Sequence, residues 1–500
     1  MLYDDENTAS GEETEVLIIG AGYSGLGMGA QLKRRGRTRF VILEQAESVG
    51  GTWRDNTYPG AACDTESPLY CYDFAPHLTL TSMFAGQQEL LGYARQLITD
   101  FDLDEHLRLG ARVTSATWQG DASIWLVESA DGRVFRARWL VSAWGQLNRP
   151  SIPDIPGLGD YRGTMFHSAR WRHDIDLAGL RVASVGNAAS AVQYIPEIAP
   201  IVSSLDVYQR SPNWIIPRGQ FSFPEDERAQ HMENPDSFFR LKHALHQERE
   251  AQHGRTVPGT EAASTFMDIA LQHLEQQVPD ATLRARLLPD YPMACKRILR
   301  TDDYYPALMR PNVHLVTEQI ARFDANGIMT EDGSRRSYDV VIFGTGFDAR
   351  SFLGGTIIAG RGGVDLRALW GDTPRAYSGI SVPSFPNMFL LYGPNTNLGH
   401  NSVIGMIQVQ QEHILDALDF AEANDVCAIE VRESVAEQFD DEVVRRLTAS
   451  AWAANCNSWY KNAAGRVVNN WYGTVEEYRR TAKFDAESYL AVVAPLRADA

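Results

Sequence analysis

The chain has 500 residues, 44% of them hydrophobic, so it is long enough for two or three domains that each bury a core. Its formal net charge of −18 argues against general binding to nucleic acid or to an anionic membrane surface, because such binders are normally basic. The first fifteen residues carry six acids and no Lys or Arg. This composition predicts a flexible acidic tail over residues 1–15 and is the opposite of a signal peptide.

Cysteine and histidine usage indicates a reducing compartment and no metal site. The five cysteines include no CxxC pair, and their odd number predicts no disulfide framework. The twelve histidines include no HExxH motif, and no Cys/His cluster has the spacing of metal ligands. No apolar run approaches the roughly 18 residues of a membrane span. We therefore expect a soluble cytoplasmic protein without a metal.

A dinucleotide-binding pattern follows the tail. The apolar strand over residues 15–20 runs into GAGYSG, in which Gly20, Gly22 and Gly25 complete G-x-G-x-x-G. Glycines at this turn allow a tight bend, close approach of a pyrophosphate and close packing of helix on strand. The next strand ends in Glu44, whose carboxylate can accept hydrogen bonds from ribose hydroxyls and would repel a 2′-phosphate. The combination favours a dinucleotide site over a purely structural turn.

The same arrangement recurs further along the chain with a different ending. An apolar strand over residues 180–186 enters GNAASA, and a helical run and another strand follow. Gly20 to Glu44 spans 24 positions, and so does Gly186 to Arg210. An arginine there, with Ser211 beside it, suits the 2′-phosphate of NADP. A solvated charge at a strand end is the alternative for Arg210, and the matching offset favours the phosphate role.

The second turn departs from the glycine pattern. Ala188 stands where a second glycine is usual and Ala191 where a third is usual, with Ser190 between them. A methyl group at this turn would push a pyrophosphate slightly outward. We therefore expect NADP to bind at this turn, through Gly186, Ala188 and Ser190, but less tightly than a full glycine pattern would allow.

Two further strands indicate a split architecture. Strands ending near residues 145 and 344 flank the second unit and stop at glycines. The predicted fold class is α/β, with two dinucleotide-binding, Rossmann-like domains, the NADP domain inserted in the FAD domain, and a helical insertion. The expected FAD-binding parts are 16–148 and 335–500, the NADP-binding parts are 149–220 and 291–334, and the insertion is 221–290.

Apolar residues recur at helical spacing within that insertion. They predict an ordinary helical subdomain, with a role as a wall of the substrate pocket as a second hypothesis. These residues are Phe238, Leu241, Leu245, Phe266, Ile269, Ala270, His273, Leu274 and Val278.

The stretch GGTWRDNTYPGAACD, residues 50–64, has neither the period of a strand nor that of a helix. With the two dinucleotide units, it resembles the Baeyer–Villiger monooxygenases, a family of FAD- and NADPH-dependent flavin monooxygenases. The family pattern [AG]-G-x-W-x4-[FY]-P-[GM]-x3-D is met at every position, by Gly50, Gly51, Trp53, Tyr58, Pro59, Gly60 and Asp64. The pattern F-x-G-x3-H-x3-W-[PD] is met in part. Gly163, His167 and Trp171 match, whereas Tyr161 and Arg172 depart from it.

The resemblance assigns roles along the first pattern and in the segment CKRILRTDDYY. It implies that Arg297 stabilises a flavin peroxide anion, and guanidinium suits this task because it keeps its proton. Asp64 would hold Arg297, and Lys296 would help Arg210 bind the 2′-phosphate. Without the resemblance, Lys296 and Arg297 would be read as solvated surface charges. The residues expected to contact FAD here are Gly51, Thr52, Trp53, Asp64 and Tyr70.

Two C-terminal segments fit the same site. Residues 392–406 predict a helix capped by Asn401 or Ser402, with its N-terminus aimed at the flavin and with Ile404, Ile407, Ile414 and Leu418 inward. Trp459 resembles the family tryptophan that touches the nicotinamide cofactor, although a core tryptophan is an equal alternative. Tyr304 and Tyr305, beyond Arg297, fit either pocket lining or packing.

The implied function is Baeyer–Villiger oxidation, in which NADPH and O2 insert one oxygen atom next to a ketone carbonyl to give an ester or lactone. The substrate would be a small-molecule ketone, and the oligomeric state is open between monomer and dimer. One alternative is an N- or S-oxygenating monooxygenase on the same scaffold. NADPH oxidase and non-catalytic flavoprotein are others. A disulfide reductase is disfavoured because Cys63 and Cys71 lack the close spacing of a redox pair.

Overall fold

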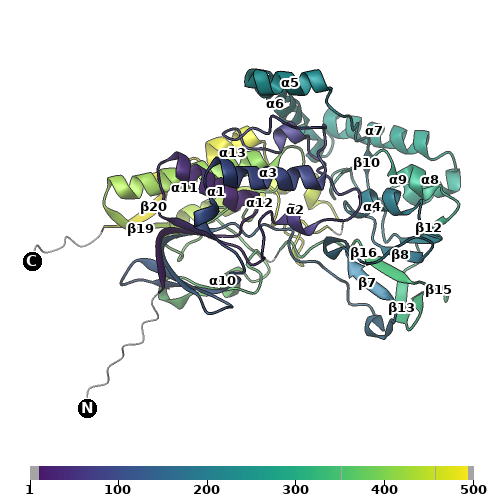
Figure 1. The fold of residues 1–500 in the computed structure, drawn as a ribbon, viewed down its shortest axis with the longest axis horizontal. Coiled ribbons are helices and arrows are strands. Elements are labelled where there is room, and N and C mark those ends of the chain that lie inside the picture. The colour runs from purple at the N-terminus through teal and green to yellow at the C-terminus, as the bar shows by residue number, and fades with distance from the viewer. Residues whose placement is uncertain (1–10, 351, 457, 494–500) are drawn as a thin grey trace, which may run out of the picture.

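Two sheets with parallel cores organise the computed structural model, which describes residues 11–350, 352–456 and 458–493 (Figure 1). Helices α1, α3 and α11 pack together beside the first sheet, and the helices of the insertion lie away from it (Figure 1). Within the described residues, no helix combines the length and the hydropathy that crossing a membrane requires.

The first sheet has the strand order β17-β4-β5-β6-β1-β2-β3, with β18 also paired to β6. At its centre, β1 runs parallel to both β2 and β6, so Ile18 lies opposite Ile42 and Val141. Where these strands pair at the sheet centre, residues 16–19, 40–43 and 139–141 are buried and apolar without alternation, because both faces of the sheet are covered there. The strands are β1 (Glu12–Ile19), β2 (Phe40–Leu43), β3 (Leu107–Arg108), β4 (Val113–Gln119), β5 (Ile124–Ser129), β6 (Val134–Ser142), β17 (Ile357–Ala359) and β18 (Met388–Leu390).

The second sheet is parallel throughout, in the order β12-β9-β8-β16-β7. It corrects one predicted boundary. The strand after residue 335, expected to return to the first domain, is β16, which pairs with β7 and β8 of the second sheet. The chain rejoins the first sheet only at β17. The five strands are β7 (Thr164–His167), β8 (Arg181–Val185), β9 (Ser204–Tyr208), β12 (Val313–Val316) and β16 (Val340–Phe343).

Smaller strand pairs complete the fold. The antiparallel sheet of β13 (Ile320–Asp324), β14 (Gly327–Thr330) and β15 (Arg335–Ser337) precedes β16, and β19 (Val426–Val431) pairs with β20 (Tyr489–Val493). The short parallel pair β10 (Ile215–Ile216) and β11 (Leu299–Arg300) joins two segments that are far apart in sequence. Residues 12–15, predicted to belong to the acidic tail, are part of β1, and the rest of the predicted tail up to residue 10 lies outside the described residues.

The helices are α1 (Tyr23–Arg34), α2 (Thr52–Asp55), α3 (Gln87–Asp100), α4 (Ala191–Ile198), α5 (Glu225–Glu233), α6 (Pro235–Ala251), α7 (Glu261–Gln277), α8 (Ala281–Leu287), α9 (Tyr304–Leu308), α10 (Leu366–Trp370), α11 (Val403–Ala423), α12 (Glu433–Leu447) and α13 (Val475–Thr481). Helices α5 to α8 form the predicted insertion. In α7, Phe266, Ala270 and His273 are buried as expected, but Ile269 is 36% exposed because it lies at the edge of the buried stripe.

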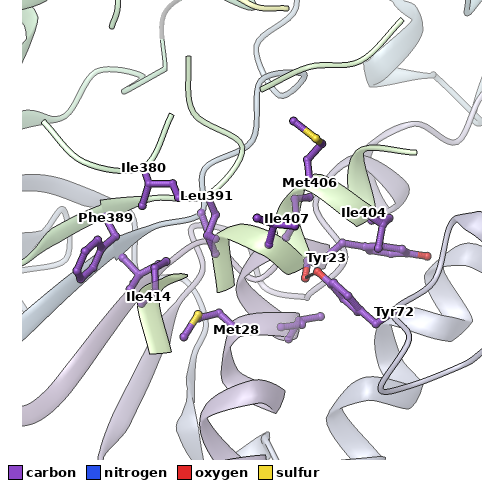
Figure 2. Packing of buried hydrophobic residues seen from close by; sticks show 14 of the residues in the cluster. Tyr23, Met28, Tyr72, Ile380, Phe389, Leu391, Ile404, Met406, Ile407 and Ile414 are labelled. Carbon is purple, nitrogen blue, oxygen red and sulfur yellow. Dashed lines mark hydrogen bonds between the residues drawn. The ribbon is translucent and has the colours of Figure 1, made fainter. Parts of the chain in front are cut away.

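The largest core lies between α1, α11 and the first sheet (Figure 2). Met28 of α1 and Ile407 of α11 are among its buried residues, as are Tyr72 and Phe389 from outside these helices. The predicted start of α11 is confirmed, because the Ser402 hydroxyl accepts a hydrogen bond from the Ile404 amide, 3.2 Å long. The residues predicted to point inward are buried: Ile404, Ile407, Ile414 and Leu418.

One disulfide contradicts the expectation drawn from the cysteine count. Cys295 is bonded to Cys456, across a sequence separation of 161 residues. The pairing has no local spacing signal, so it could not be read from the sequence. The other described cysteines are free thiols, with Cys63 and Cys71 buried. The bridge ties the segment that carries Lys296 and Arg297 to the C-terminal segment that carries Trp459.

Candidate active site

The first strand-to-helix turn forms a narrow backbone cradle. Gly20 has a φ of +107°, and a Cβ on Gly25 would lie 1.8 Å from the Gly20 carbonyl oxygen. Gly22 precedes the first residue of α1, where backbone amides point outward and favour an anion. Gly51, with φ +53°, approaches so closely that its Cβ would stand 3.1 Å from the Gly22 Cα. Side chains at either glycine would fill the cradle, which therefore fits a pyrophosphate.

Glu44 is fixed at the end of β2. Its side chain is buried, and its two carboxylate oxygens accept hydrogen bonds from the amides of Ala21 and Ala46, each 3.0 Å long. Arg54 adds a 2.9 Å ion pair. A carboxylate has about four lone-pair positions, so capacity for a ribose hydroxyl remains.

The second turn brings basic side chains together. Gly186 has a φ of +102°, and Arg210 and Ser211 follow β9. Lys296 donates a 2.7 Å hydrogen bond to the Ser211 hydroxyl. Burial lowers the pKa of Lys296, and the charge of Arg210 lowers it further. Two cations held close to one another favour an anion between them, and a 2′-phosphate has the charge and the acceptor oxygens for this position.

Arg297 and Asp64 form a two-pronged ion pair. Arg297 Nε donates to Asp64 Oδ2 over 3.0 Å, and Nη2 donates to Oδ1 over 2.6 Å. The neighbouring carboxylate raises the pKa of Arg297. Burial alone would raise the pKa of Asp64, but Arg297 outweighs it and holds that pKa below its ordinary value. Both groups are therefore charged across the working pH range, and the guanidinium has a fixed direction.

The backbone around each partner explains this placement. The Ala62 carbonyl accepts a 3.0 Å hydrogen bond from Gln193 of α4, and the Tyr58 hydroxyl donates to the same side chain over 2.9 Å. Helix α4 of the second sheet thus holds the segment that precedes Asp64. On the other side, the Leu299 amide donates to the Trp214 carbonyl over 2.9 Å, extending the β10–β11 pair. Gln193 gave no signal in the sequence.

One channel of about 1770 Å³ connects these features. Every predicted site residue except Gly25 lines it, and Gly25 acts through packing inside α1. The lining includes Gly20, Gly22, Glu44, Gly51, Thr52, Trp53, Asp64, Tyr70, Gly186, Ala188, Ser190, Arg210, Ser211, Lys296, Arg297 and Trp459. A single-ligand pocket is typically about 300–1,000 Å³, so this channel has room for two large cofactors.

Aromatic residues form part of the wall. The Tyr70 ring lies 5.4 Å from that of Tyr23 and edge-on to that of Trp53 at 5.8 Å. Trp459 is partly buried, with its ring 4.4 Å from that of Tyr460. Trp53, Tyr70 and Trp459 thus pack against neighbours and face the channel at once. Flat apolar walls of this kind suit the rings of a flavin and a nicotinamide.

Three other predicted residues have structural positions. His167 is buried and accepts a 3.1 Å hydrogen bond from the Ala169 amide, and burial lowers its pKa to about 4. It is a neutral residue that shapes the turn after β7, within the second sheet's domain. Tyr304 and Tyr305 are almost fully buried in the second core, which decides between pocket lining and packing in favour of packing.

Comparisons with known proteins show the family through relatives that match nearly the whole chain. A family model described as pyridine nucleotide-disulphide oxidoreductase matches residues 17–223. A Baeyer–Villiger monooxygenase from Pseudomonas aeruginosa is 38% identical, over 98% of this chain and 94% of that protein. The chain belongs to the Baeyer–Villiger monooxygenase family.

Solved structures extend the match to the fold and the cofactors. The closed crystal structure of a cyclohexanone monooxygenase matches with a TM-score of 0.87 and 28% identity, covering 97% of this chain and 100% of that one. OTEMO in complex with FAD and NADP matches with a TM-score of 0.85 and 27% identity, covering 96% and 99%. This Baeyer–Villiger monooxygenase therefore has the predicted α/β fold with two Rossmann-type domains, and it uses FAD and NADP(H).

The two buried thiols of this Baeyer–Villiger monooxygenase, Cys63 and Cys71, do not fit disulfide-reductase chemistry, although the family model carries that name. Burial, together with the nearby charge of Asp64, raises the pKa of Cys63 to about 12. Burial also raises the pKa of Cys71. Neither thiol forms the reactive thiolate at neutral pH that exchange with a disulfide requires.

Proposed function

We propose that the chain oxidises ketones to esters or lactones. In this reaction NADPH supplies a hydride, which is two electrons and one proton, and the solvent supplies a second proton. One atom of O2 enters the bond between the carbonyl carbon and its neighbour. The other atom leaves as water with these two protons. Bound FAD would supply the redox chemistry that activates O2. The proposal rests on the Arg297 guanidinium, which Asp64 holds in a fixed direction. It faces a channel that also contains the glycine turn at Gly20 and the basic residues Arg210 and Lys296.

The residues of the chain have distinct tasks in this proposal. Gly20, Gly22 and Gly51 hold the FAD pyrophosphate, and Glu44 accepts a ribose hydroxyl, so the first sheet carries FAD. The second sheet carries NADP, through the turn at Gly186 and a basic cluster for the 2′-phosphate. That cluster consists of Arg210, Ser211 and Lys296. The predicted division into FAD- and NADP-binding parts is thus retained as a proposal, with the second boundary moved beyond β16.

Arg297 stabilises the negative charge that builds up on oxygen as the ketone is attacked. An arginine suits this task because it cannot lose its proton near neutral pH, and because a partly dry channel strengthens its field. Asp64 is a positioning residue, which aims the guanidinium without touching the reacting atoms. Trp53, Thr52, Tyr70 and Trp459 line the channel and exclude water from the reacting centre.

Two measurements on Arg297→Ala test the proposal. Anaerobic mixing with NADPH follows bleaching of the flavin, and incubation in air with a panel of linear, cyclic and aromatic ketones follows ester or lactone formation. We expect flavin reduction to persist and product formation to fall by a factor of about 10²–10³ or more. Arg445→Ala is the matched control, because Arg445 is 69% exposed on α12 and its only ion pair with a described residue is with Glu442 on the same helix.

The outcomes separate the proposal from its rivals. Undiminished ester formation by Arg297→Ala would remove the assigned role of Arg297. If the wild-type protein consumes NADPH with every ketone and yields only hydrogen peroxide, it is an oxidase towards them. If it oxygenates amines or sulfides but no ketone, the activity is N- or S-oxygenation. A flavin that NADPH does not bleach would indicate a non-catalytic flavoprotein.

A further inference from the structure

A second, smaller cavity adjoins the channel at Arg297. Its volume is about 60 Å³, and it is lined by the segment 64–66, by the end of the insertion helix α6 and the turn after it, and by residues 398–401. A water molecule needs roughly 10–15 Å³ of such space. The cavity therefore has room for several waters or for a small polar group of a substrate whose carbonyl lies beside Arg297.

Positive charge dominates this cavity. Among the described lining residues, four arginines face two carboxylates, and Lys296 is directed to Ser211. Asp64 pairs with Arg297, whereas Glu66 is shared. Buried Glu66 accepts a 3.0 Å hydrogen bond from Arg249 Nε and a 2.8 Å bond from Arg300. Both carboxylates are thus already engaged.

Of the four described arginines that line the cavity, Arg255 is the one without a carboxylate partner. It is 7% exposed, and its Nη atoms donate to neutral acceptors, the Gln252 side chain over 3.2 Å and the Gly399 carbonyl over 2.8 Å. Its Nε has no hydrogen-bond acceptor, and its guanidinium lies 4.8 Å from the Phe266 ring centre. A buried cation without a counterion is costly unless another group neutralises it.

The neighbouring ionisable groups do not neutralise Arg255. The Glu250 carboxylate accepts hydrogen bonds from Asn401 and from the backbone amides of Val475 and Glu476, so it caps α13. Burial lowers the pKa of His400 to about 4, so this ring is neutral. Burial, with repulsion from other arginines, also lowers the pKa of Arg255 to about 9, which leaves it charged at neutral pH.

We propose that Arg255 anchors an anionic group of the substrate, so that the preferred substrates are ketones that carry a carboxylate a few bonds from the carbonyl. This inference rests on the proposed ketone oxidation. The small volume of the cavity favours a carboxylate over a bulkier anion. Two N–H groups of a guanidinium can donate to the two oxygens of a carboxylate at once. Arg297 would meet the carbonyl and Arg255 the carboxylate, which fixes the direction of the substrate in the cavity.

Binding tests the subsite without catalysis. The FAD-loaded protein is melted with pentanoate or with pentanamide, which has similar size but no charge. We expect pentanoate alone to raise the melting temperature of the wild-type protein. Arg255→Met, which keeps the bulk but not the charge, should lose this shift. Arg255→Lys keeps the positive charge but not the paired N–H donors of the guanidinium, so it should retain part of the shift in melting temperature. If the Met variant folds poorly, the Lys variant serves in its place.

Turnover tests the substrate class. Levulinate and methyl levulinate share the ketone and differ in the charge of the carboxyl group. We expect wild-type kcat/KM for levulinate to exceed that for the ester about 10-fold or more, and Arg255→Met to lower it about 10- to 100-fold while affecting the ester much less. Equal kcat/KM values for the two ketones, or a preference that survives in Arg255→Met, would overturn the inference.

The two tests also distinguish this inference from the proposed function. If Arg255 is required for pentanoate binding but no ketone gives an ester, the anion subsite is present and the proposed ketone oxidation fails. If methyl levulinate gives product while pentanoate does not stabilise the protein, ketone oxidation stands and the subsite does not exist.

Discussion

Replacing Asp64 by Asn separates two possible roles of this residue. Asn has almost the same shape, but it removes the charge that Arg297 contacts through Nε and Nη2. If Asp64 mainly positions the guanidinium, the variant should slow ester formation. If Asp64 mainly dampens the field of Arg297, removal of its charge should speed ester formation. We expect positioning to dominate, because the pair has two hydrogen-bonding prongs and a misdirected charge gives little stabilisation of the reacting oxygen.

The size of the effect follows from the geometry. Two unit charges about 4 Å apart attract by about 4 kcal/mol at an effective dielectric constant of 20. The side chains are 37% and 23% exposed, so water screens the pair and leaves about 1–2 kcal/mol. If that energy restrains the guanidinium, its loss corresponds to about a 5- to 30-fold fall in the rate of ester formation. Hydride transfer from NADPH should change by no more than about 2-fold, because Arg297 is not assigned to it.

Stopped-flow reduction and product analysis measure the two half-reactions. Asp339→Asn is the control, because Asp339 forms a similar two-pronged pair with Arg181 outside the channel. A rate that rises in Asp64→Asn, or that stays unchanged, would refute the positioning argument. Because the pKa of Asp64 is depressed in the folded protein, the stabilisation from this pair is present above the unfolded value of about 3.9 and is lost only as pH falls through the folded value. Stability contributed by the pair should therefore be constant from about pH 5 upward.

Three further substitutions test the cofactor sites and the buried charges. Gly51→Ala adds a Cβ 3.1 Å from the Gly22 Cα at a positive φ and should lower the FAD content of the purified protein, read from its absorbance ratio, whereas Gly92→Ala in open space on α3 should leave it unchanged. Arg210→Ala should raise KM for NADPH about 10-fold or more and leave KM for NADH nearly constant; equal changes would exclude a 2′-phosphate contact. Glu66→Gln leaves Arg249 and Arg300 unneutralised and should lower the free energy of unfolding by about 3–5 kcal/mol in urea titrations, a loss that a solvated pair would not show.

The parts of the site that sequence patterns predicted are local in the chain. The turn at Gly20, the cap at Ser402 and the offset from Gly186 to Arg210 each lie within a few tens of residues, where strand and helix periods are readable. Membership of the Arg297 segment in the same site came from a family resemblance, since nothing local places Arg297 beside Asp64. The structure supplies the reason: the β10–β11 pair places the Arg297 segment beside residues 215–216, and Arg218, just after β10, donates a 3.1 Å hydrogen bond to the Cys63 carbonyl.

The errors arise where distant segments meet. The strand β16 has the apolar run of any buried parallel strand, so its sequence could not say which sheet it joins. The Cys295–Cys456 bridge spans 161 residues and leaves three free cysteines in the described chain, so an odd count concealed it. Arg255 gave no signal at all, because an unpaired buried cation is recognisable only when its whole surroundings are known.

Segment 64–66 connects Arg297, the proposed catalytic residue, to the helical insertion. Asp64 holds Arg297, and two residues later Glu66 holds Arg249 of α6, so the guanidinium and the insertion are fastened to the same short stretch. The insertion is therefore more than the ordinary helical subdomain favoured by its apolar periodicity, because it contributes Arg249 and Arg255 to the cavity wall. Since α6 does not line the channel that contains both dinucleotide turns, we expect substitutions on α6 to change substrate preference and to leave FAD and NADP binding unchanged.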